Sequence, residues 1–137
     1  QGNLERQAIA QWLAYELMSE VLERPYEDPN ETPVFGLEAS EASLTRSTYD
    51  DVDDYGGWQK SPPQQKDGTP YWHLTDWKRL IVIQRVDPAN YDLVRTYETG
   101  VRKIKVNVYY KDTKLLSVVA LRSGTPASAI ENPIPLG

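Results

Sequence analysis

Asn3-Leu4-Glu5-Arg6-Gln7-Ala8-Ile9-Ala10-Gln11-Trp12-Leu13-Ala14-Tyr15-Glu16-Leu17-Met18-Ser19-Glu20-Val21-Leu22-Glu23-Arg24 opens the chain with one uninterrupted pattern. It contains no glycine or proline and is rich in strong helix formers, and Pro25 then ends it because proline cannot continue a helix. At about 100° per residue, one side gathers apolar residues, namely Ala10, Ala14, Tyr15, Leu17, Met18, Val21 and Leu22. The sequence therefore predicts one amphipathic helix over residues 1–24.

The first half of this helix is apolar on a second side as well. Ile9, Trp12 and Leu13 project from the side that carries Glu16 and Glu20 further along. An apolar side that does not belong to the core stripe is typical of a surface covered by another molecule. We therefore expect Ile9, Trp12 and Leu13 to be exposed in the isolated domain and to contact neighbouring subunits.

The composition is that of one globular domain with no cysteine chemistry. The chain has 137 residues, no cysteine, and nine tyrosines and four tryptophans against a single phenylalanine. A net charge of −5 argues against nucleic acid as a partner. No run of eighteen apolar residues is present, so the sequence given contains no predicted membrane span.

The charges are separated along the chain. Residues 16–54 carry twelve acids and two bases, whereas residues 78–122 carry ten bases and four acids. These two regions are expected to attract each other. They either neighbour one another within the fold or pair head to tail between copies.

The most distinctive local string is Tyr49-Asp50-Asp51-Val52-Asp53-Asp54-Tyr55-Gly56-Gly57-Trp58. Asp50, Asp51, Asp53 and Asp54 form a candidate calcium site, because Ca²⁺ takes several oxygen ligands, although the spacing is not that of an EF-hand loop. A second interpretation is a turn whose Asp side chains cap backbone N–H groups. The apolar members recur every three residues, which would press them onto the core.

Residues 25–76 are predicted to be an irregular acidic region because prolines interrupt them repeatedly, with one short helical turn at 38–44. The aromatic residues Trp58, Tyr71, Trp72 and Trp77 either pack or form a platform for stacking on sugars. His73 is the only histidine and has no nucleophile or metal ligand nearby in sequence, so it is interpreted as structural.

Strand patterns dominate the sequence from residue 77 onward. Strands are predicted at 77–86, 101–109 and 115–122, with a shorter strand or loop at 91–98 and a flexible tail at 123–137. Between Lys103 and Tyr109 the alternation of apolar and polar residues is strict. The fold class is therefore predicted as α+β, a single domain in which a long N-terminal helix packs on a C-terminal antiparallel sheet of three or four strands.

No sequence signature of catalysis is present. The chain lacks a nucleophile elbow, a phosphate-binding glycine loop and zinc-ligand spacing. We therefore expect a binding or assembly protein, with no enzymatic activity and no cofactor other than the possible calcium.

This plan resembles that of type IV pilins and of the pseudopilins of type II secretion. The second half of the helix, from Ala10 to Leu22, and the string Tyr26-Glu27-Asp28-Pro29 that follows look like the corresponding part of minor MSHA-type pilins. The string Asp50–Trp58, the prolines at 62 and 63 and the strand Arg102–Val108 resemble the same proteins, so the likeness spans most of residues 7–122.

The resemblance implies a longer precursor, whose leader is cleaved and whose hydrophobic half-helix upstream of Gln1 holds the subunit in the inner membrane. It implies a domain that faces the periplasm and then enters a filament at the cell surface, with other pilin or pseudopilin subunits as partners. Some pseudopilins hold Ca²⁺ in an acidic loop, which agrees with the candidate site at Asp50–Asp54. The alternative from the residues alone is an extracellular carbohydrate-binding module that uses Trp and Tyr stacking.

Overall fold

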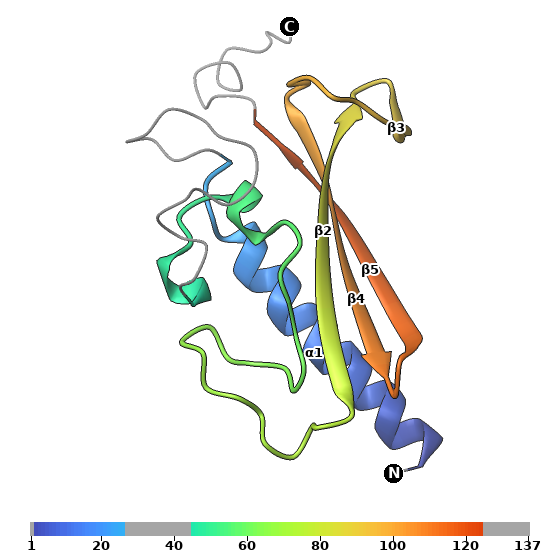
Figure 1. The fold of residues 1–137 in the computed structure, drawn as a ribbon. Helices are drawn as coiled ribbons and strands as arrows, with labels where there is room; N and C mark the ends of the chain where they lie inside the picture. Colours follow the sequence, from blue (N-terminus) through green and yellow to red (C-terminus); the bar gives the residue numbers. More distant parts are fainter. Residues whose placement is uncertain (1, 27–44, 125–137) are drawn as a thin grey trace, which may run out of the picture.

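The computed structural model describes residues 2–26 and 45–124, and in this part of the chain one helix lies against one face of an antiparallel sheet (Figure 1). The elements in chain order are α1 (Asn3–Leu22), η2 (Arg46–Thr48), η3 (Val52–Tyr55), β1 (Gln59–Lys60), β2 (Trp77–Asp87), β3 (Asn90–Val94), β4 (Val101–Tyr110) and β5 (Thr113–Ser123). The short 3₁₀ helices and the loops between β1 and β2 lie beside α1, on the side of the sheet that α1 covers.

The sheet has the order β1-β2-β4-β5, and β3 pairs with the C-terminal end of β2, at Val86 and Asp87. All pairings are antiparallel, and the β4–β5 pair runs along nearly the whole length of both strands. Lys111 and Asp112 form the turn between them with φ of 48° and 66°, which is the left-handed geometry that two-residue hairpins favour.

The predicted fold class is wrong in two respects. The sheet has five strands and not three or four, and the helix of 20 residues is short and not long. The fifth strand is β1, in which Gln59 and Lys60 pair with Leu80 and Arg79 of β2. The prolines of this region predict a loop there. Packing of the helix on an antiparallel sheet is nevertheless observed, since α1 contacts β4 and β5.

The core lies between α1 and the inner face of the sheet. Leu17 and Val21 of α1 meet Ile81 of β2 and Ile104 and Val106 of β4, and all five are fully buried. The strand residues that reach this core alternate with residues that face away, as the period of two requires. Burying one apolar stripe and one apolar sheet face stabilises the two layers together.

Some sequence predictions lie outside the described residues. These are the helical turn at 38–44, most of the proline-rich connector after residue 26 and the tail beyond residue 124. Within the described ranges, the structure contains no helix that is both long enough and apolar enough to cross a membrane.

Candidate functional site

The three residues predicted to face neighbouring subunits do not share one environment. Leu13 is fully buried, Ile9 is partly buried against the core, and only Trp12 is exposed, at 49%. The expectation that all three are exposed is therefore wrong for Leu13 and overstated for Ile9. Trp12 rests edge-on against Tyr71, with ring centroids 5.1 Å apart.

The irregular middle of the chain covers the acidic side of α1, which explains why Leu13 is buried. Arg46 makes a two-pronged ion pair with Glu20, with both N···O distances at 2.9 Å. Arg79 of β2 binds Glu16 at 2.8 Å and also donates to the backbone oxygen of Leu13. The carboxylates that looked solvent-facing in the sequence thus bind arginines of the same chain.

A different side of α1 remains exposed. Its large apolar residues are Leu4 (82% exposed), Trp12, Tyr15 (58%) and Leu22 (39%), and Ala8 and Ser19 lie between them. Their spacing puts them on the side opposite the buried stripe, which corrects the placement of Tyr15 and Leu22 on the core face. We call this surface the outer stripe of α1. A shallow open groove of about 480 Å³ runs along it beside Trp12 and Tyr15.

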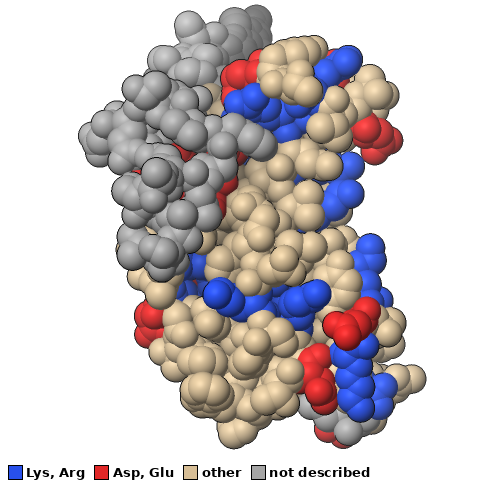
Figure 2. Space-filling view, in the orientation of Figure 1, with Lys and Arg blue, Asp and Glu red and all other residues tan. Residues whose placement is uncertain are grey.

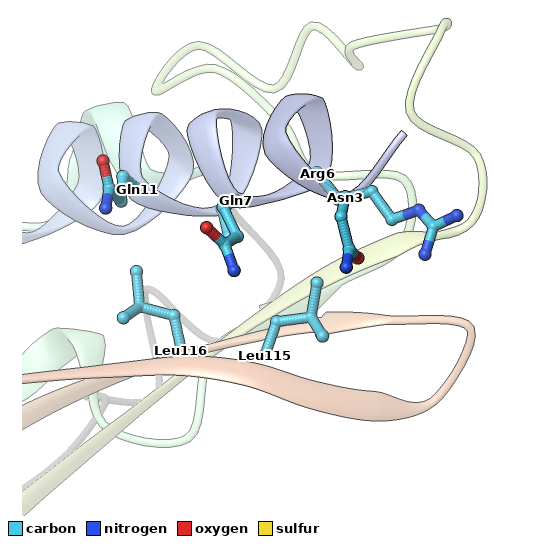
Figure 3. A pocket seen from close by; sticks show the side chains of 7 residues that line it. Asn3, Arg6, Gln7, Gln11, Leu115 and Leu116 are labelled. Atoms are coloured by element: carbon cyan, nitrogen blue, oxygen red, sulfur yellow. The ribbon is translucent and has the colours of Figure 1, made fainter. Parts of the chain in front are cut away.

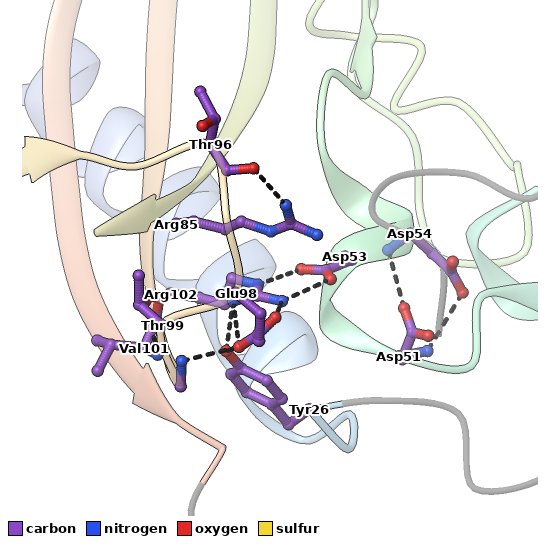
Figure 4. A network of polar contacts seen from close by, with 11 residues as sticks. Tyr26, Asp51, Asp53, Asp54, Arg85, Thr96, Glu98, Thr99, Val101 and Arg102 are labelled. Carbon is purple, nitrogen blue, oxygen red and sulfur yellow. Dashed lines mark hydrogen bonds and ion pairs between the residues drawn. The ribbon is translucent and has the colours of Figure 1, made fainter. Parts of the chain in front are cut away.

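The four aspartates predicted to form a calcium site are divided between two roles. Asp53 turns away from the others and pairs with Arg102 of β4, at 2.8 Å and 3.1 Å (Figure 4). Asp51 and Asp54 form a reciprocal capping box around η3, in which each carboxylate accepts the backbone N–H of the other residue. The interpretation of capping aspartates is therefore confirmed for these two residues, although the turn is buried and not solvated.

Asp50, Asp51 and Asp54 still offer three carboxylate oxygens within 4.8 Å of one another. Oδ1 of Asp54 is buried without a hydrogen-bond partner, and burial together with the Asp54 carboxylate raises the pKa of Asp51 to about 7. A cation would relieve the repulsion between the carboxylates of Asp51 and Asp54, but Ca²⁺ takes six to eight oxygen ligands, so these three residues fit only part of its coordination shell.

Calcium binding at Asp50, Asp51 and Asp54 stays a prediction, now without Asp53. An unfolding temperature that millimolar calcium leaves unchanged would contradict it.

The apolar residues that recur every three positions in the same string pack into the core, as predicted. Tyr49, Val52, Tyr55 and Trp58 are all buried in the core cluster. Trp77 is also buried, so Trp58 and Trp77 are unavailable to a sugar, and Tyr71 bonds Glu16 through its hydroxyl. Trp72 is exposed at 69% and is the one ring of the predicted platform that is left largely open.

Arg102 is the centre of a polar network that joins four segments of the chain (Figure 4). Besides Asp53, its guanidinium binds Glu98 at 2.6 Å and 3.1 Å, and it bonds the hydroxyl of Tyr26, whose ring lies 4.4 Å away. Burial raises the pKa of Asp53 against the opposing effect of Arg102. The network therefore ties the end of α1 and η3 to the sheet.

Glu98 should make the stability of this network sensitive to acid. Its hydrogen bond from Arg102 lowers its pKa from 4.5 to about 2, so the unfolded chain binds more protons in that interval. We expect the free energy of unfolding to fall as the pH drops from about 4.5 toward about 2, and to fall less in Glu98→Gln. Thermal unfolding across this range tests it. If the unfolding temperatures of the two proteins fell equally with pH, the result would contradict the role given to Glu98.

A second hollow separates the start of α1 from β5 (Figure 3). It has a volume of about 260 Å³ and is lined by the amides of Asn3, Gln7 and Gln11 on one side and by Leu115 and Leu116 on the other. In Figure 3 the side chains of Asn3 and Gln7 point from the helix toward Leu115 and Leu116. The first turns of α1 are thus packed less closely on the sheet than the rest of the helix.

Comparison with known proteins gives no relative. No protein-family model, curated protein or solved structure matches this chain.

Proposed function

We propose that this chain is a structural subunit of a filament, a minor pilin or pseudopilin of a type IV pilus or type II secretion-like system, that assembles through α1. The observation that carries the proposal is the outer stripe of α1. A second, exposed apolar side on a helix that already packs on its own sheet is typical of a surface that another molecule covers.

The shape of this surface suits packing between subunits. A helix of 20 residues is about 30 Å long, and its exposed apolar residues extend from Leu4 near its start to Leu22 at its end. Trp12 and Tyr15 lie in the middle, and rings of this kind contribute much of the binding energy where proteins meet. The outer stripe therefore replaces Ile9, Trp12 and Leu13 as the proposed filament interface, and only Trp12 belongs to both sets.

The resemblance to pilins supplies the rest of the proposal. A hydrophobic segment upstream of Gln1 would hold the subunit in the inner membrane before assembly, with this domain in the periplasm. The partners would be other pilin or pseudopilin subunits, and the assembled chain would lie in a filament.

A charged residue in the outer stripe should prevent assembly without unfolding the domain. We expect Tyr15→Lys, made in the full gene product in its own cells, to reduce recovery of the chain with the filament fraction several-fold. Tyr97→Lys is the matched control, because Tyr97 is 57% exposed and lies outside α1. Equal recovery of both variants with the filaments, or absence of the unaltered chain from them, would contradict the proposal.

A further inference from the structure

The free edge of β5 is a long strand edge with little protection. β5 is the last strand in the sheet order, so among the described residues only β4 pairs with it. From Leu115 to Leu121 it contains no charged residue and no proline, which are the residues by which exposed strand edges commonly avoid pairing with other chains. Its pairing with β4 is irregular at the start of the strand, opposite Val108 and Tyr109. The rest of this edge is open to another strand.

Alternate residues of β5 direct their backbone groups outward. Gly124, just after β5, donates its N–H to Gly100 on the β4 side, and the pairing with β4 continues in register from there to Leu116. In an antiparallel ladder, the residues between such hydrogen-bonded pairs point their N–H and C=O groups the other way. In β5 these outward residues are Ser117, Val119 and Leu121. All three are exposed, so this edge can accept an extended polypeptide segment as a further strand.

The hollow between α1 and β5 lies beside this edge and would receive a side chain of the added strand. Leu116 and Val118 of β5 are partly buried against the core. A residue opposite Leu116 would point its side chain to the same side of the sheet, next to the hollow of about 260 Å³ that Leu116 helps to line. Gln7 and Gln11 form part of the other wall, and amides both donate and accept hydrogen bonds. The hollow therefore suits a large side chain with a polar end.

Charge limits the kind of segment that fits this edge. Lys114 and Arg122 bound the uncharged part of β5, and Lys105 of β4 pairs with Val119. Figure 2 shows basic side chains following the side of the molecule on which the sheet lies. Like charges on neighbouring strands are unfavourable, so a segment with lysine or arginine fits poorly here. The edge favours an apolar segment that carries no basic residue.

We infer that the free edge of β5 binds an extended apolar segment of a different filament subunit by strand addition. This inference rests on the proposed function, which supplies the partner. The edge adjoins the outer stripe of α1, because the 100° spacing places Gln7 and Gln11 between that stripe and the side of the helix that is buried on the sheet. A subunit that covers the outer stripe would therefore lie next to β5.

A second copy of the chain fits this edge less well than a different subunit. Two β5 edges are identical, so they would pair in an antiparallel arrangement with two-fold symmetry. Their α1 helices would then point in opposite directions. Under the proposed function, subunits enter the filament from one membrane in one orientation. We therefore assign the edge to a segment of a different subunit.

Strand addition can be tested on the 137-residue chain with a synthetic peptide as the probe. An uncharged peptide of alternating valine and threonine is added, and hydrogen exchange of the backbone N–H groups is measured by NMR. We expect the outward N–H groups of Ser117, Val119 and Leu121 to exchange fast without the peptide and several-fold more slowly with it. The N–H of Val118, which points to β4, should exchange slowly in both cases. The same peptide with two consecutive central prolines should protect none of the outward groups, because it lacks donors on both of its edges.

A proline at position 119 separates strand addition from folding. Val119→Pro removes an outward donor and leaves the hydrogen bonds between β4 and β5 in place, which is where edge strands tolerate proline. Val119→Thr is the matched control, because threonine keeps the N–H and is also β-branched. We expect Val119→Thr to bind the peptide like the unaltered chain and Val119→Pro to bind it several-fold more weakly. Val119→Lys, which keeps the N–H but places a charge on the edge, should also weaken binding. Thermal unfolding shows that each variant is folded.

The outcomes separate this inference from the proposed function. A peptide that protects none of the outward N–H groups, or that binds Val119→Pro and Val119→Thr equally, would overturn strand addition. Protection that appears without peptide and grows with protein concentration would assign the edge to a second copy and overturn the choice of partner. These measurements need no filament, so such results leave assembly through α1 intact. Absence of the chain from filaments would overturn the proposed function and, with it, the filament subunit as partner.

Discussion

Arg102→Met should destabilise the domain by about 3–5 kcal/mol at neutral pH, which is the usual loss when one partner of a buried ion pair is removed. The side chains of Arg102 and Asp53 are 1% and 6% exposed, so the substitution removes the main charged partner of a buried carboxylate. Asp53 would stay behind as a buried carboxylate whose pKa burial already raises. The free energy of unfolding from urea titration, measured at neutral pH, checks this result.

A second substitution separates the lost pair from lost packing. Arg102→Met combined with Asp53→Leu removes both charges, and replacing a whole buried ion pair by apolar residues is often neutral or stabilising. We therefore expect the double variant to be more stable than Arg102→Met alone. A double variant at least as unstable as the single one, or a single variant that loses less than about 1 kcal/mol, would contradict the role given to the pair.

Leu13→Ala should cost about 2–5 kcal/mol, the range for removing a leucine side chain from a packed core. Leu13 is fully buried in the core cluster, so its removal would leave a cavity among packed side chains. The urea midpoint and slope measure the change.

Leu4→Ala is the matched control, because Leu4 is 82% exposed on the same helix. Surface substitutions of this kind usually stay within about 0.5 kcal/mol. Similar losses for the two variants would mean that Leu13 is not buried as described and that the sides of α1 are wrongly assigned.

Local patterns in the sequence predicted much of the fold. The absence of glycine and proline placed the helix, and alternation placed β4 to within one residue of its observed end at Tyr110. Leu17 and Val21 were correctly placed in the core. The number of strands was not predictable in this way, because β1 has only two residues and exists through its pairing with β2.

The candidate site depended on contacts between distant residues, which the sequence pattern does not show. Asp53 and Arg102 are 49 residues apart, and Arg79 binds Glu16 across 63 residues. The separation of acidic and basic regions was the available signal, and it did not distinguish arginines that pair inside the fold from lysines that face outward. This is why Leu13 was expected to be exposed and Asp53 was assigned to calcium.

The inward arginines and the outward lysines of the basic half of the chain lie in different environments. Arg79 and Arg102 hold the irregular acidic middle and α1 against the sheet. Lys103 and Lys105 lie on the opposite face of the sheet, where Lys103 contacts Asp92 and the backbone oxygen of Tyr91. Arginine suits the first position because its planar fork can bind two acceptors at once.

The most direct test of the central claim is a scan in which a photo-reactive residue replaces single positions of α1 in the full gene product and is cross-linked in the cells that assemble it. Our account predicts cross-links to neighbouring subunits at positions 4, 8, 12, 15, 19 and 22. It predicts few at the exposed position 7, on another side of α1, and few at the control position 97, which lies outside α1. The pattern should repeat with the helical period of about 3.6 residues. Cross-linking that is uniform along α1, or absent from the outer stripe, would contradict assembly through this surface.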